Sequence, residues 1–139
     1  MKKEYLYKTT AVNTDGVNGY AYIDEEDGMR VEVSSPLNKQ PGTNPEELLG
    51  LSLSTCFNST IKAILKEKNL VNDSRVEVPV QLKIETDDSG YFFDVAIHVA
   101  IEGLDSEKAD KIVTAASHRC PVYKLISQSR TVLLKTIEF

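Results

Sequence analysis

The sequence predicts an α+β fold whose sheet is mainly antiparallel. Stretches rich in aromatic and β-branched residues occur in groups, three before residue 34 and two between residues 76 and 102, with one more near the end. Stretches with helical periodicity stand between these groups. Strands that are grouped apart from helices are typical of α+β proteins. The chain 1–139 is long enough for one domain with one core.

The first part of the chain predicts a three-stranded meander. Aromatic and β-branched residues indicate the first two strands, and alternation of apolar with charged residues indicates the third. Glycine, asparagine and aspartate mark the turns between them. The strands are expected at 4–12, 20–23 and 29–33, with turns at 13–19 and 24–28 and a loop at 34–43.

A long helix is predicted from Asn44 to about Asn69. Asn44 suits the N-cap, Pro45 suits the first helical position, and Glu47 completes a capping-box pattern. One face is apolar, and the middle of the opposite face consists of small uncharged residues. The apolar stripe is Leu49, Leu53, Cys56, Phe57, Thr60, Ile61 and Ile64, and the small residues are Ser52, Ser54, Thr55 and Ser59. We therefore expect a central helix that is covered on both sides.

The rest of the chain predicts a hairpin, two helices and a final strand. Pro79 has no backbone N–H, so its segment is expected at a sheet edge or a bulge. Asp105 or Ser106 is expected to cap the second helix, which ends near His118, and Pro121 suits the first turn of a short third helix. The expected strands are 76–85, 91–102 and 131–139, and the third helix is expected at 122–127.

Composition argues against several classes of partner. The net charge is -5 and no basic patch occurs, which argues against nucleic acid or an anionic membrane. No apolar run approaches the length of a transmembrane helix, and residues 1–8 lack the apolar core of a signal peptide. We therefore expect a cytoplasmic protein, in which a stable structural disulfide is not expected.

The chain has two cysteines, Cys56 and Cys120, which are free thiols, a redox pair or partial metal ligands. A cysteine in the middle of a helix is often a buried small apolar residue. Cys120 lies at a helix N-cap, where unpaired N–H groups lower a thiol pKa, and Arg119 and His118 add positive charge nearby. A zinc site that added His118 and His98 would have no closely spaced ligand pair, so neither a metal nor a cofactor is expected.

Two segments resemble the signatures of the OsmC/Ohr family, whose members are thiol-dependent peroxidases that reduce organic hydroperoxides. The first is Gly42-Thr-Asn-Pro-Glu-Glu-Leu-Leu-Gly50, followed by Ser54-Thr-Cys-Phe57. The second is His118-Arg-Cys-Pro-Val-Tyr123. The chain length and the order of the elements are also similar to the family, so the resemblance covers the whole chain.

The resemblance implies an intertwined homodimer, in which two sheets wrap around two central helices and two active sites lie at the interface. Cys56 matches the peroxidatic cysteine, whose thiolate is oxidised to sulfenic acid, and Cys120 matches the resolving cysteine that forms a disulfide with it. Glu46 matches the glutamate that orients a catalytic arginine. An external dithiol, such as a lipoyl group, would regenerate the enzyme.

One position departs from the family pattern. The family's arginine lies after the first strand in a Gly-Arg-x-Gly pattern, where this chain has Gly16-Val-Asn-Gly19. Val17 carries no charge, although the pKa of a thiol in an apolar pocket rises unless a cation compensates for the burial. Of the four arginines in the chain, Arg119 is the best substitute because it directly precedes Cys120.

Two functions are therefore expected as alternatives. The first is a homodimeric, cysteine-based organic hydroperoxide reductase in oxidative stress defence, which the presence of Cys56, Cys120 and Glu46 favours. The second is a protein of the same fold that has weak or lost peroxidase activity and binds a small hydrophobic or electrophilic molecule. The uncharged side chain of Val17 favours this second function.

Overall fold

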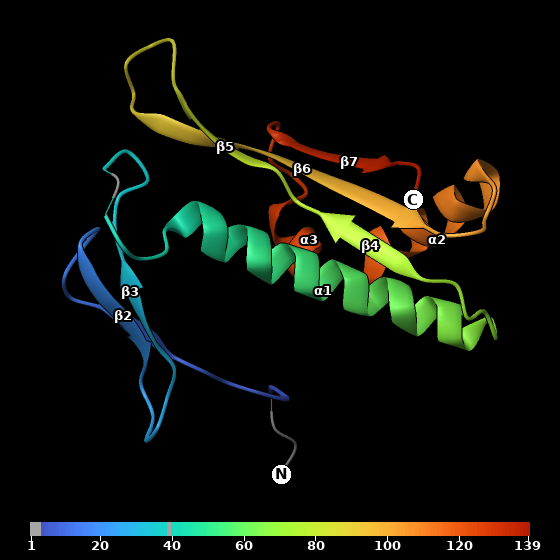
Figure 1. Cartoon of the computed structure of the whole chain (residues 1–139), viewed down its shortest axis with the longest axis horizontal. Coiled ribbons are helices and arrows are strands. Elements are labelled where there is room, and N and C mark those ends of the chain that lie inside the picture. The colour runs from blue at the N-terminus through green and yellow to red at the C-terminus, as the bar shows by residue number, and fades with distance from the viewer. Residues whose placement is uncertain (1–3, 39) are drawn as a thin grey trace. The chain divides into compact units, whose positions relative to one another are not determined.

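The computed structural model describes residues 4–38 and 40–139, so residues 1–3 and position 39 of the predicted loop lie outside the described range. The chain forms two compact units, Met1–Pro45 and Glu46–Phe139 (Figure 1). The strands are β1 Ala11–Asn13, β2 Gly19–Ile23, β3 Arg30–Val33, β4 Ser74–Glu77, β5 Val80–Ile84, β6 Tyr91–Ile101 and β7 Val132–Thr136. The helices are α1 Pro45–Glu67, α2 Ser106–Arg119 and α3 Pro121–Ile126.

The first unit contains the predicted antiparallel meander, in the order β1-β2-β3. The strand expected at 4–12 is wrong over most of its length, because β1 begins only at Ala11 and the Leu6 side chain is fully exposed. Ala11 pairs with Ile23, which is the last residue of β2. The residues before Ala11 therefore run past the end of their partner strand, and β propensity without a partner does not make a strand.

The second unit has a sheet built on β6, with β4 and β5 paired to it antiparallel (Figure 1). The two pairings share one continuous register, from Ser74 opposite Ile101 to Ile84 opposite Tyr91. The strand predicted at 76–85 is thus divided at Val78 and Pro79, as the missing N–H of proline requires. Pro79 still accepts a hydrogen bond from the Ala96 backbone N–H at 3.1 Å.

The last strand, β7, pairs with β6 in parallel, with Val132 opposite Val95. Helices α2 and α3 form the connection between these two strands. A connection that contains helices can carry the chain back to the starting end of the sheet, which is what a parallel pairing needs. The sheets are therefore mainly antiparallel, as predicted, with one parallel pair.

The core of the second unit lies between α1, α2 and the sheet. Leu53, Phe57 and Ile61 of α1 are completely buried, and they pack in one cluster with residues of β6 and α2. The partners are Val95, Ile97, Val99 and Ile101 of β6 and Ala109, Ile112, Val113 and Ala116 of α2. Cys120 belongs to this cluster and Cys56 packs against it. The buried stripe of α1 predicted from helical spacing is confirmed.

The opposite face of α1 is open in the single chain. Ser52, Thr55 and Ser59 are exposed, and Leu51 is 64% exposed. By length and composition alone α1 is long and apolar enough to cross a membrane, a property that it shares with core helices of soluble proteins. The second unit by itself therefore covers only one side of α1, and the cover on both sides expected from the sequence stays a prediction.

Candidate active site

The two cysteines meet where α1 passes the junction of α2 and α3. Their Sγ atoms are 3.3 Å apart, Cys120 donates to Cys56, and both are free thiols. Because an S–S bond is about 2.0 Å long, a closer approach of about 1.3 Å would join them. The structure therefore brings together two of the three predicted site residues.

Cys56 lies at the boundary of the buried face of α1. Its neighbours Leu53 and Phe57 are completely buried, whereas Cys56 itself is only half-buried. The Thr60 hydroxyl donates to the Cys56 carbonyl at 3.0 Å. The backbone of Cys56 thus belongs to a core helix, while its thiol retains access to solvent and to a dissolved reactant.

The position of Cys120 is set by the ends of two helices. Its backbone N–H donates to the Ala116 carbonyl at 2.9 Å and so closes α2, which Asp105 caps at its other end. Cys120 is also the N-cap of α3, with Pro121 at the first helical position, as predicted. Its Sγ accepts a hydrogen bond from the Tyr123 backbone N–H at 3.5 Å.

The pKa of the Cys120 thiol is raised, so the lowering expected at a helix N-terminus is wrong. Burial is the main cause, because it disfavours the charged thiolate. The Tyr123 N–H acts in the opposite direction but is outweighed, and the neighbouring Cys56 raises the pKa further. The buried environment of Cys120 therefore favours its protonated thiol over the thiolate.

Arg119 binds Glu67 and not the cysteines in this structure. Its guanidinium makes a paired contact with the Glu67 carboxylate, with N–O distances of 3.0 and 2.9 Å. The pKa of Glu67 is lowered mainly by this hydrogen bond. Glu67 lies eleven residues after Cys56, or about 16 Å along the helix axis. Arg119, the best candidate to replace the missing loop arginine, therefore pairs with Glu67 and not with the cysteines.

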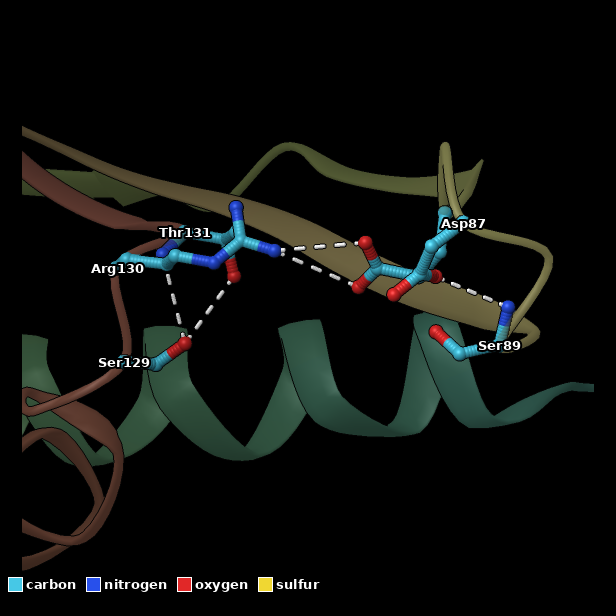
Figure 2. Close-up of polar contacts among 6 residues, drawn as sticks. Asp87, Ser89, Ser129, Arg130 and Thr131 are labelled. Atoms are coloured by element: carbon cyan, nitrogen blue, oxygen red, sulfur yellow. Dashed lines mark hydrogen bonds and ion pairs between the residues drawn. The ribbon is translucent and has the colours of Figure 1, made fainter.

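The other three arginines also have partners. Arg30 of the first unit lies over the Tyr20 ring at 4.1 Å, and Arg75 donates to the Phe139 carbonyl at 3.0 Å. Figure 2 shows Arg130, between Ser129 and Thr131, reaching toward the β5–β6 turn. There its Nη2 lies 3.5 Å from both carboxylate oxygens of Glu85. Each of the four arginines thus has an interaction partner other than a cysteine.

Val17 lies in the β1–β2 turn of the first unit and is 49% exposed. The turn is held by its own side chains: Asn13 Oδ1 accepts from the Gly16 N–H at 2.7 Å, and Asp15 Oδ2 accepts from the Tyr20 N–H at 3.0 Å. Gly19 has a φ of 143°, and a Cβ there would lie 2.4 Å from Asp15. This closed turn presents an uncharged side chain where the family pattern has arginine.

Glu46, the third predicted site residue, is not close to the thiols in the second unit. It lies in the first turn of α1 and is half-buried. Ten residues, or about 15 Å of helix axis, separate it from Cys56. The structure therefore does not bring Glu46 together with the cysteine pair.

Tyr123 is a site residue that the sequence interpretation missed. Its N–H donates to Cys120, and its ring packs edge-on against Phe57 with the centroids 5.8 Å apart. The sequence did contain a signal for this contact. Tyr123 is the third residue after the N-cap Cys120, and an N-cap side chain commonly accepts a hydrogen bond from the N–H of that position. Glu67, the partner of Arg119, had no comparable local signal.

The arrangement suits thiol chemistry. A half-buried thiol lies next to a completely buried one, so a sulfenic acid formed on Cys56 would already be within reach of Cys120. Within residues 4–38 and 40–139, no three His, Cys, Asp or Glu side chains are grouped so that they could hold a metal ion.

Comparisons with known proteins agree on one family. The family model described as OsmC-like protein matches residues 37–135. The organic hydroperoxide resistance protein OhrB of Bacillus subtilis is 35% identical over 107 residues, which are 74% of this chain and 79% of OhrB. An organic hydroperoxide resistance protein-like sequence of Staphylococcus aureus is 32% identical over 122 residues, which are 85% of this chain and 86% of that protein.

Solved structures agree with this result. A protein of Lactobacillus casei is 40% identical, with a TM-score of 0.89 over 98% of this chain and 94% of that one. The structure of OhrB of Bacillus subtilis has a TM-score of 0.83 at 29% identity, over 97% of this chain and 100% of OhrB. With two family signatures, the thiol pair and the shared fold, the chain belongs to the OsmC/Ohr family of OsmC-like proteins.

Proposed function

We propose that this protein is a thiol-dependent peroxidase that reduces organic hydroperoxides in oxidative stress defence. The observation that carries the proposal is the 3.3 Å separation of two free thiols that differ in solvent access. Relatives named as organic hydroperoxide resistance proteins support the choice of substrate class.

In the proposed reaction the Cys56 thiolate attacks the peroxide oxygen. The O–O bond breaks, Cys56 becomes sulfenic acid, and the leaving alkoxide takes a proton from water to become an alcohol. The Cys120 thiol then attacks the sulfenic sulfur, an S–S bond forms, and water leaves. An external dithiol, such as a lipoyl group, reduces the disulfide by exchange. Cys56 takes the first role because it is the more accessible thiol.

The proposed enzyme works as a homodimer in the cytoplasm. The uncharged face of α1, with Leu51 64% exposed beside Ser52 and Thr55, supports the dimer because small residues allow another helix to approach closely. We expect light scattering at micromolar concentration to give the mass of two chains. A compact monomer would contradict the dimer.

A second candidate function is supported by the missing cation. Val17 is uncharged, and each of the four arginines has a partner other than a cysteine. These observations favour a weak peroxidase, or a protein that binds a small hydrophobic or electrophilic molecule without turnover.

The two functions are separated by one assay. We expect cumene or tert-butyl hydroperoxide to be consumed faster than hydrogen peroxide when a dithiol is supplied. Cys56→Ser should abolish consumption, and Cys120→Ser without the dithiol should consume about one equivalent and then stop. Equal inactivity of the parent and Cys56→Ser, with both folded, would favour the binding protein.

A further inference from the structure

We propose that Cys120 has a role before disulfide formation: its S–H donates a hydrogen bond that stabilises the Cys56 thiolate. This inference rests on the proposed function, because it concerns the thiolate that would attack the peroxide. The donor geometry is the 3.3 Å contact from Cys120 Sγ to Cys56 Sγ. A resolving cysteine needs only to reach the sulfenic acid after oxidation, whereas this contact already exists between the two free thiols.

The surroundings of Cys120 keep it a donor. Its Sγ is completely buried and accepts the Tyr123 N–H at 3.5 Å, so Cys120 accepts from one side and donates to the other. Hydrogen bonds in such a chain polarise and strengthen one another in a buried site. The raised pKa of Cys120, caused mainly by burial, is consistent with a thiol that retains the proton it donates.

In the second unit, a thiolate on Cys56 would depend on a neutral hydrogen-bond donor for its stabilisation. The titratable group in contact with Cys56 is Cys120, and Tyr123 lies against Cys120 and Phe57; neither side chain can carry a positive charge. Arg119 is paired with Glu67, and Lys124 on α3 and Lys62 on α1 are exposed.

The sheet presents no charge to Cys56 from the strand that packs on α1. In β6, Val95 and Ile97 point into the core. Asp94 and His98 alternate with them and so point to the other face, where Asp94 pairs with Lys83. A hydrogen bond to a charged group is the stronger kind, so one S–H donor can replace part of the stabilisation that a cation would supply.

The test compares Cys120→Ser with Cys120→Ala. Neither variant can form the disulfide, so both stop after the first chemical step and leave Cys56 as the only thiol. The serine hydroxyl can still donate to Cys56, and the alanine methyl cannot. Each is treated with one equivalent of cumene hydroperoxide at neutral pH, and the rate of sulfenic acid formation is measured with a trapping reagent. The Cys56 thiolate is measured separately from its ultraviolet absorbance.

We expect the thiolate fraction of Cys56 to be about tenfold lower in Cys120→Ala than in Cys120→Ser where thiolate is the minor form. Sulfenic acid formation should be about threefold slower, because a less stabilised thiolate is more nucleophilic and offsets part of the loss. Ser117→Ala is the matched control in α2: its hydroxyl bonds to the Thr114 carbonyl at 2.6 Å, and it should change neither quantity.

Equal thiolate fractions in the serine and alanine variants would overturn the donor role and leave Cys120 with resolution alone. A difference in thiolate fraction without any reaction with peroxide would uphold the donor role and remove the peroxidase function. If Cys120→Ala does not fold, Cys120→Thr and Cys120→Val form a second pair of nearly equal shape with and without a donor, to which the same criteria apply.

Discussion

The junction that holds Cys120 and the turn that holds Val17 differ in whether each has the feature expected of it. From the family pattern, the junction was expected to bring two thiols together, and the turn was expected to present a cation. The junction is fully formed: two helix ends, a proline and a backbone N–H place one thiol 3.3 Å from another. The turn is equally well ordered by Asn13 and Asp15, yet it presents an apolar side chain. The pairing of the thiols is therefore complete within the second unit, whereas the turn of the first unit presents no cation at position 17.

The largest expected effect is on the cysteine junction itself. Phe57→Ala should destabilise the protein by about 3–5 kcal/mol, because it empties a completely buried site and removes the ring against which Tyr123 packs. Urea unfolding measures this change, and disulfide formation by an added oxidant should slow as Cys120 loses its support. Lys62→Ala, at an exposed position of the same helix, is the control and should change stability by less than about 0.5 kcal/mol.

The next effect depends on pH and tests the burial of Cys120. The pKa of Cys120 is raised in the folded protein, so above the ordinary thiol pKa of about 8.5 the folded state binds more protons than the unfolded state. The free energy of unfolding should therefore fall as the pH rises from that value to the folded pKa. Urea titrations of the parent and Cys120→Ser should diverge only in this alkaline range. Parallel curves would show that burial does not control this thiol.

A smaller effect is expected from placing a cation in the turn. Val17→Arg should raise the rate of sulfenic acid formation by about threefold for each tenfold gain in thiolate, because nucleophilicity falls as the thiolate is stabilised. Val17 is 49% exposed, so the change should leave stability nearly unaltered. Val17→Gln is the uncharged control. If glutamine raises the rate as much as arginine does, charge is not what the turn lacks.

The smallest effect is expected at Arg119. Arg119→Ala removes an exposed ion pair with Glu67, so it should change the free energy of unfolding only slightly and leave the first step of peroxide reduction unchanged. Stopped-flow oxidation of the parent and the variant checks this. A large loss of rate would mean that this guanidinium turns to the thiols during the reaction and that its pairing with Glu67 is not the working state.

Much of the fold could be predicted from local signals. Capping residues and prolines act within a few residues of themselves, so the start of α1, the Asp105 cap and the start of α3 at Pro121 were all predicted correctly. Pro79 divided its strand for the same local reason. The strand expected at 4–12 failed because a strand depends on a partner that composition does not reveal.

By itself the sequence determined which residues can react: two thiols, one of them at a helix cap. It also determined the apolar helical stripe that includes Cys56 and the absence of arginine from the first turn. Only the tertiary structure decided that the thiols touch, that β7 pairs in parallel with β6, and that Arg119 binds Glu67. It also reversed the expected pKa of Cys120, because burial depends on which distant segments cover a residue, whereas the N-cap depends only on its neighbours in the chain.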